Sequence, residues 1–141
     1  MVLRGERWML KILIVDDMAV SRLILKKMLL KEGYEIAGEA EDVTDAVSKY
    51  ESLHPDLVIM DIGLPGKIEA VKKEILKTGG ITAIREIIKA DSNARIIACT
   101  AMNYKEIVME VLSAGAKDYI LKPVEPAKLI AAIKKVMGSE V

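Results

Sequence analysis

Five polar side chains in this 141-residue sequence stand at the ends of short apolar runs, where they could act together. Two are adjacent acids, one is a third acid, one is a hydroxyl and one is an amine: Asp16, Asp17, Asp61, Thr100 and Lys122. Three carboxylates brought close together repel one another, and such a cluster favours a bound cation. Because every acidic ligand is an oxygen and an open site retains water, the expected ion is Mg²⁺ rather than Ca²⁺.

Lys122 and Thr100 extend the expected chemistry from metal binding to phosphoryl transfer. Lys122 would supply a fixed positive charge opposite the metal, and Thr100 would supply a short hydroxyl donor. Phosphoryl transfer depends mainly on positioning and charge neutralisation, and a carboxylate is a known nucleophile that forms an aspartyl phosphate. The residue types therefore predict a receptacle for a phosphoryl group, built with Mg²⁺ around one carboxylate.

The apolar runs that precede these residues predict the elements that position them. The runs are apolar throughout, without polar alternation, which favours parallel strands covered by helices on both faces. Predicted strands span 11–17, 34–39, 56–61, 95–100 and 117–121, and predicted helices span 18–32, 42–53, 80–90, 103–114 and 126–138. We therefore expect an α/β fold with a doubly wound five-stranded parallel sheet, whose carboxyl ends place the polar residues on one edge.

Composition and charge limit the other functions that such a chain could have. Lys plus Arg and Asp plus Glu both number 21, so the basic excess typical of a nucleic-acid-binding protein is absent. The single cysteine, Cys99, excludes an internal disulfide, and no apolar run is long enough to span a bilayer. The first ten residues alternate charged and apolar side chains too finely for a signal peptide. We expect a single-domain cytoplasmic protein without nucleic-acid or membrane partners.

The order of these motifs resembles a known family. Asp16-Asp17, Asp61, Thr100 and Lys122-Pro123 stand at successive strand ends, as in the CheY-like receiver domains of two-component response regulators. The resemblance covers residues 11–138 and leaves 1–10 as an N-terminal extension. It implies the flavodoxin-like arrangement of the doubly wound sheet. It also implies that Asp61 accepts a phosphoryl group from a histidine kinase or a phosphotransfer protein.

The resemblance further implies a ligand set for the metal. Asp17, Asp61 and the backbone carbonyl of Gly63 would bind Mg²⁺, and Asp16 would assist through water. These ligands would place the metal next to the carboxylate that accepts the phosphoryl group.

Other residues acquire switching and tuning roles from the resemblance. Lys122 would contact the phosphoryl group, and Thr100 and Tyr119 would change position when it arrives. Gly63 and Met102 stand two residues beyond the acceptor and beyond Thr100, where receivers tune the access of water to the acyl phosphate. The apolar Met102 supplies no charge to orient water, which favours a long-lived phosphorylated form.

The connection after Pro65 departs from the family pattern, because the matching glycine is delayed to Gly80. The inserted segment, about 66–79, has an apolar stripe surrounded by charged residues, a pattern that predicts a short amphipathic helix. Two interpretations remain open at this point. The insert packs as an excursion on the domain surface, or it lies over or beside Asp61, where it would shield the acid, select the kinase or offer a binding or dimer face.

The expected output is a change in a protein-binding surface. No linker to an output domain is evident, so we expect a stand-alone receiver whose partner protein binds the helix from Asn103 to Ala114, the fifth strand and the last helix. We expect no enzyme activity beyond self-phosphotransfer and self-dephosphorylation. Three alternatives stay open: a phosphorylation-independent binding module, an aspartyl-phosphate phosphohydrolase, which would need an acid where Gly63 stands, and a flavin-binding domain.

Overall fold

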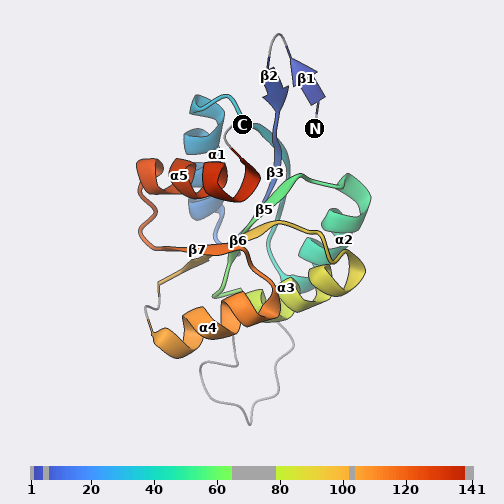
Figure 1. Ribbon diagram of the computed structural model, residues 1–141, viewed down its shortest axis with the longest axis vertical. Helices are drawn as coiled ribbons and strands as arrows, with labels where there is room; N and C mark the ends of the chain where they lie inside the picture. The colour runs from blue at the N-terminus through green and yellow to red at the C-terminus, as the bar shows by residue number, and fades with distance from the viewer. Residues whose placement is uncertain (1, 5–6, 65–78, 102–103, 139–141) are drawn as a thin grey trace.

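A computed structural model of the chain describes residues 2–4, 7–64, 79–101 and 104–138. Its strands are β1 (Val2–Arg4), β2 (Arg7–Met9), β3 (Lys11–Val15), β4 (Glu35–Ala40), β5 (Leu57–Asp61), β6 (Ile96–Thr100) and β7 (Asp118–Leu121). Its helices are α1 (Ala19–Lys31), α2 (Val43–Leu53), α3 (Gly79–Ala90), α4 (Lys105–Ala114) and α5 (Pro126–Met137). From β3 onward strands and helices alternate, as the sequence predicts (Figure 1).

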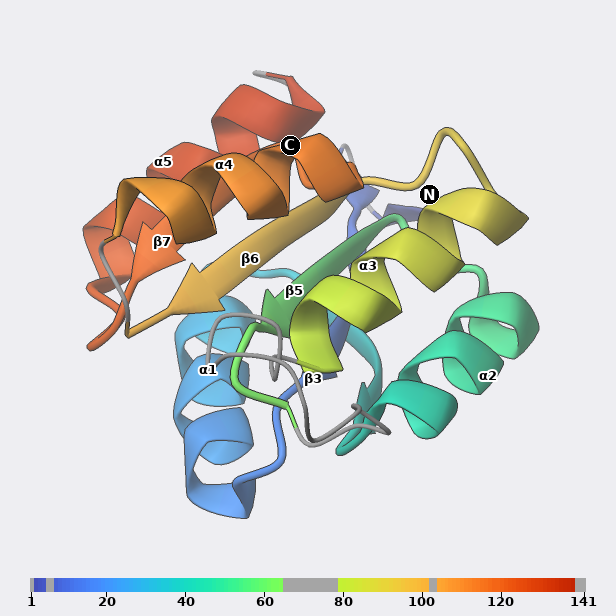
Figure 2. The same ribbon diagram turned by 90° about the horizontal axis from the view of Figure 1, so that it is seen from below.

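The main sheet has five parallel strands in the order β4-β3-β5-β6-β7. Helices α1 and α5 cover one face, and α2, α3 and α4 cover the other (Figure 2). The chain therefore winds in both directions from β3, and the predicted doubly wound α/β fold is confirmed. The predicted strands and helices match the observed ones to within a few residues at their ends.

Residues of the central strands point alternately into two separate cores. On β3, Leu13 and Val15 belong to the core under α2, α3 and α4, whereas Ile12 and Ile14 belong to the core under α1 and α5. All four side chains are at most 1% exposed. A strand buried on both faces needs apolar residues at every position, which is why the sequence shows runs rather than alternation.

A short antiparallel hairpin precedes the main sheet, and the sequence analysis did not predict it. Strands β1 and β2 form their own two-stranded sheet, in which Leu3 pairs with Trp8. The fully buried Leu10 connects this hairpin to β3 (Figure 1). Three-residue strands are too short to show a hydrophobic period, so the pattern that identified the longer strands was absent here.

Two of the predicted helices lie next to or within segments that the structure does not describe. The helix expected from Asn103 begins at Lys105, because Tyr104 adopts the extended backbone of an N-cap, with φ −88° and ψ 136°. The helix expected within 66–79 lies outside the described residues, except that Gly79 opens α3. No helix among the described residues is both long and apolar enough to cross a bilayer.

Candidate functional site

The polar residues singled out by the sequence lie at the carboxyl edge of the sheet. Asp16 directly follows β3, Asp61 ends β5, Thr100 ends β6 and Lys122 directly follows β7. Strands β3 and β5 pair up to Val15 and Met60, so Asp16 and Asp61 leave neighbouring strands at the same level. Parallel strands end on a common edge, and this alignment is what gathers residues from distant parts of the chain.

Three carboxylates meet at this edge. Oxygen atoms of Asp16, Asp17 and Asp61 all lie within 4.8 Å of one another. Asp16 is 1% exposed and Asp61 is 6% exposed, whereas Asp17 is open to solvent. A set of close oxygen ligands with one open side matches the donor chemistry of a hard, partly hydrated divalent cation.

Lys122 bridges two of these carboxylates. Its Nζ atom donates to Oδ1 of Asp61 at 2.9 Å and to Oδ2 of Asp16 at 3.2 Å. The Lys122–Pro123 peptide bond is cis. One ammonium group therefore partly balances the three clustered acids, and the local charge remains negative.

Backbone donors complete the positioning of the two buried carboxylates. The Met18 N–H donates to Oδ1 of Asp16 at 2.9 Å, and the Gly63 N–H donates to Oδ1 of Asp61 at 3.2 Å. The Gly63 N–H and the Lys122 ammonium group therefore both contact Oδ1 of the Asp61 carboxylate. These two contacts orient the carboxylate through the same oxygen atom.

Burial and charge pairing have opposite effects on the pKa values of Asp61 and Lys122. Burial raises the pKa of Asp61, and the nearby charge of Asp16 adds to this, although Lys122 and the Gly63 N–H oppose it. Burial lowers the pKa of Lys122, but its hydrogen bond to Asp61 and the charges of both acids outweigh burial, so this pKa is raised. Because its pKa is raised, Lys122 stays protonated at neutral pH and presents an ammonium group to both acids.

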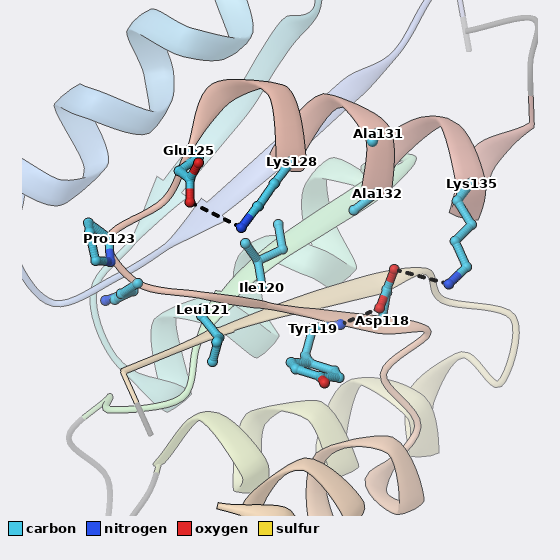
Figure 3. A pocket seen from close by; sticks show the side chains of 11 residues that line it. Asp118, Tyr119, Ile120, Leu121, Pro123, Glu125, Lys128, Ala131, Ala132 and Lys135 are labelled. Atoms are coloured by element: carbon cyan, nitrogen blue, oxygen red, sulfur yellow. Dashed lines mark hydrogen bonds and ion pairs between the residues drawn. The ribbon is translucent and has the colours of Figure 1, made fainter. Parts of the chain in front are cut away.

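Thr100 ends β6 next to this centre, whereas Tyr119 lies within β7, three residues before Lys122. Thr100 is 1% exposed, and its carbonyl accepts the Lys122 N–H at 2.8 Å, which ties the end of β6 to the residue that pairs the acids. Tyr119 is half-buried against the core under α2, α3 and α4. Figure 3 shows its ring on the opposite side of β7 from Ile120, whose side chain belongs to the other core.

A surface pocket runs along the outer edge of β7 beside α5 (Figure 3). Its lining includes Tyr119, Leu121, Lys122, Pro123 and Lys128. Only Lys122 is shared with the acidic cluster, so the pocket is distinct from that cluster and lies on the surface where the sequence analysis expects a partner.

The structure leaves the predicted roles of Gly63 and Met102 untested. Gly63 is exposed and turns its N–H toward Asp61, and metal binding by its carbonyl stays a prediction. Met102 lies outside the described residues. Cys99 is a buried free thiol whose pKa burial raises to about 12, consistent with an inert position inside β6.

Two residues that the sequence analysis did not assign to the site lie against it. A Cβ atom added to Gly80 would lie 2.3 Å from the Asp61 carbonyl oxygen and 2.5 Å from Cα of Ile62, so only glycine fits there. Arg22 donates from Nη1 to the Asp16 carbonyl at 2.7 Å. The sequence signal for Gly80 is its place as the delayed glycine after Pro65, whereas Arg22 looks like any other cation on an amphipathic helix.

Comparisons with known proteins show the family of this chain. The family that matches is the response regulator receiver domain, over residues 12–134. The chain is similar to the chemotaxis protein CheY of Thermotoga maritima, with 46% identity over 126 residues that cover 89% of this chain and 96% of that protein. It is also similar to CheY of Bacillus subtilis, with 42% identity over 128 residues, or 91% and 98% of the two chains.

Solved structures of similar proteins share the fold of this chain. A chain in the crystal structure of a CheX-CheY complex with BeF3 and Mg²⁺ from Borrelia burgdorferi matches with a TM-score of 0.79 and 32% identity, over 90% of this chain and 88% of that one. A CheY-like receiver domain protein from Methanospirillum hungatei matches with a TM-score of 0.75 and 30% identity, over 91% and 93%.

Proposed function

This chain belongs to the response regulator receiver family of two-component signalling, and we propose that it accepts a phosphoryl group on Asp61 from a histidine kinase or a phosphotransfer protein. The observation that carries this proposal is the bridging of Asp61 and Asp16 by Lys122, beside the third carboxylate of Asp17. This arrangement combines a nucleophile, a fixed cation and a set of oxygen ligands at one edge of the sheet.

The proposed reaction forms one bond to phosphorus and breaks another. A carboxylate oxygen of Asp61 attacks the phosphorus atom of the donor phosphohistidine, and the bond from phosphorus to the imidazole nitrogen breaks. The bonding electron pair leaves with the imidazole nitrogen. Lys122 lies beside the acceptor, so its ammonium group neutralises negative charge on the phosphoryl oxygens as they arrive.

The donor set fits a magnesium ion. Asp17, Asp61 and the backbone carbonyl of Gly63 would hold the ion directly, and Asp16 would reach it through water, in keeping with its own hydrogen bonds to Lys122 and the Met18 N–H. When bound, Mg²⁺ would neutralise the repulsion between the acids and the phosphoryl oxygens. The related CheY complex from Borrelia burgdorferi contains both BeF3 and Mg²⁺, which supports this assignment.

The proposed output is a rearrangement of the surface formed by α4, β7 and α5. A phosphoryl group adds close to two negative charges and three acceptor oxygens, which can recruit Thr100 and Lys122 and let Tyr119 follow. The surface has exposed apolar side chains available for a protein partner, including Tyr104, Met109 and Leu121. We expect signalling by protein binding in the cytoplasm, without turnover of a separate substrate.

A phosphorylation assay with a matched variant tests this proposal. The protein is incubated with acetyl phosphate and Mg²⁺, and intact mass is compared for the wild type and Asp61→Asn. We expect the mass of one phosphoryl group on the wild type, loss of the signal with EDTA, and none on the variant, because an amide cannot act as the nucleophile. A titration with beryllofluoride, followed by ¹H–¹⁵N spectra, should shift Thr100, Tyr119 and Lys122 only when Mg²⁺ is present.

The same assay separates the alternatives. An unmodified wild type that also ignores beryllofluoride would contradict the proposal and favour a binding module that works without phosphorylation. Continuous release of phosphate from phosphomonoesters would instead indicate a phosphohydrolase. A yellow purified protein with a flavin spectrum would indicate a flavin-binding domain.

A further inference from the structure

Arg22 connects the first helix to the backbone of the acidic cluster. It lies one turn into α1, and its side chain is 16% exposed. Its Nη1 atom donates to the backbone carbonyl of Asp16 at 2.7 Å, and its Nε atom donates to Oε1 of Glu39 at 2.9 Å. The planar guanidinium therefore joins the end of β3 to the end of β4 with two hydrogen bonds in one plane.

The carbonyl that Arg22 contacts belongs to the peptide that joins Asp16 to Asp17. The carbonyl of Asp16 and the N–H of Asp17 are part of one rigid plane, so a bond to that oxygen sets the rotation of the whole unit. On the other side of Asp16, its own N–H donates to the Ala40 carbonyl at 3.0 Å. With both ends of Asp16 held, the plane of the peptide is set, and with it the direction of the bond from the Asp17 nitrogen to its Cα, from which the exposed Asp17 side chain leaves.

The second partner of Arg22 is itself held in place. Glu39 also accepts from Lys26 Nζ at 2.6 Å, and Lys49 donates to the Glu39 carbonyl. The hydrogen bond from Lys26 lowers the pKa of Glu39, and Arg22 lowers it further against the opposing effect of burial. Arg22 is therefore anchored to an ionised carboxylate between α1 and α2 and does not depend on the cluster for its position.

The positive charge of Arg22 should weaken the binding of a cation to the three carboxylates, whereas its hydrogen bond to the Asp16 carbonyl should strengthen that binding by orienting a ligand. A positive group next to three carboxylates lowers their attraction for a metal ion. We propose that Arg22 is a positioning residue for the metal site, which orients Asp17 by holding the Asp16 carbonyl against the anchored Glu39. This inference rests on the proposed function, because it concerns the Mg²⁺ ligands assigned there.

The test measures Mg²⁺ affinity by isothermal titration calorimetry in the absence of any phosphodonor. Loss of a residue that orients a metal ligand typically weakens metal affinity about 10-fold, and we expect this increase in Kd for Arg22→Gln. The matched control is Lys26→Gln, which removes a positive charge from the same Glu39 without contact to Asp16. We expect Lys26→Gln to change Kd by less than about twofold, because that charge is partly exposed and screened.

The sign of the effect separates positioning from simple electrostatics. If Arg22 acted only through its charge, Arg22→Gln would bind Mg²⁺ more tightly than the wild type, and that result, or an equal change in both variants, would overturn the proposal. Arg22→Lys keeps the charge but lacks the planar fork, so it should also lose affinity severalfold, and wild-type affinity in Arg22→Lys would count against the proposal. This variant keeps the test decisive if Arg22→Gln does not fold.

Two further measurements exclude a general loss of structure and isolate the premise. Urea unfolding in EDTA should give each variant the same cooperative transition as the wild type. The change in Kd then does not come from a loss of folded structure. With acetyl phosphate, Arg22→Gln should regain the wild-type rate of phosphorylation at saturating Mg²⁺, since its defect is in metal affinity. If the wild type itself binds no Mg²⁺, the proposed function fails. If the wild type binds Mg²⁺ and Arg22→Gln binds it with the same Kd, the proposed function stands and only the role of Arg22 is wrong.

Discussion

Helix α3 has a carboxyl group next to each of its ends, and the two groups have opposite properties. At its amino end Gly80 packs against the backbone of Asp61, where burial raises the pKa of the carboxyl. At its carboxyl end Asp91 accepts a hydrogen bond from the Tyr50 hydroxyl of α2 at 2.7 Å. That hydrogen bond, with a second from the Asn93 N–H, lowers the pKa of Asp91.

The contrast shows what the same residue type does in two surroundings. The Asp61 carboxylate is removed from water beside other acids, so its charge opposes folding and is available for reaction. The Asp91 carboxylate is satisfied by donors on both oxygens and remains partly open to solvent, so its charge supports the packing of α2 on α3. One end of α3 therefore carries the chemistry, and the other end holds the helix in place.

The largest expected effect comes from adding one methyl group at the amino end of α3. Gly80→Ala would place Cβ against the backbone of Asp61 and Ile62, which cannot move aside as a side chain would. We expect a loss of about 3 kcal/mol in the free energy of unfolding, measured with urea. The control is Gly63→Ala, whose Cβ would lie 3.7 Å from the nearest Asp61 oxygen, an ordinary contact. Equal stability of the two variants would contradict the close approach of α3 to Asp61.

Replacing Asp61 or Asp91 by asparagine should change the free energy of unfolding in opposite directions. Asp61→Asn removes one charge from a cluster of three acids and one lysine, so we expect it to stabilise the protein by about 1 to 2 kcal/mol in EDTA. Asp91→Asn should destabilise the protein, because it removes the ionised acceptor of Tyr50. Urea unfolding of both variants checks this, and a shift of the same sign in both would remove the contrast between the two ends.

The smallest expected effect isolates the hydrogen bond at the carboxyl end. Tyr50→Phe keeps the buried ring and removes only the hydroxyl that donates to Asp91, so we expect a loss of about 1 kcal/mol near neutral pH. Phosphorylation of Asp61 should be unchanged, since the pair lies at the other end of α3. A loss of Mg²⁺-dependent phosphorylation in this variant would show that the two ends are coupled.

The pH dependence of the same variant provides the sign test. The folded-state pKa of Asp91 lies below its ordinary value of 3.8, so its ionised form stabilises the fold above that pH, and the stabilisation is lost as pH falls through the folded pKa. The stability difference between wild type and Tyr50→Phe should therefore be constant above pH of about 5 and shrink toward pH of about 3. A difference that grows on acidification would contradict the lowered pKa of Asp91.

The sequence by itself determined the order of the elements and the residues at their ends. Runs such as 57–60 are apolar because both faces of the strand are buried, and a polar residue can follow only where the strand leaves the core. This is why the sequence alone identifies Asp61 and Thr100 as strand-end residues. The β1–β2 hairpin was missed because three residues are too few to show a period.

Only the tertiary structure decided which of these groups touch. The contacts of Lys122 with Asp61 and Asp16, and of Tyr50 with Asp91, join residues separated by 61, 106 and 41 positions along the chain. A hydrophobic period indicates which face of an element is buried, but it carries no information about the distance to another element. The close approach of Gly80 to Asp61 and the bond from Arg22 to the Asp16 carbonyl depend on that distance, because steric contact and hydrogen bonding act over only a few ångströms.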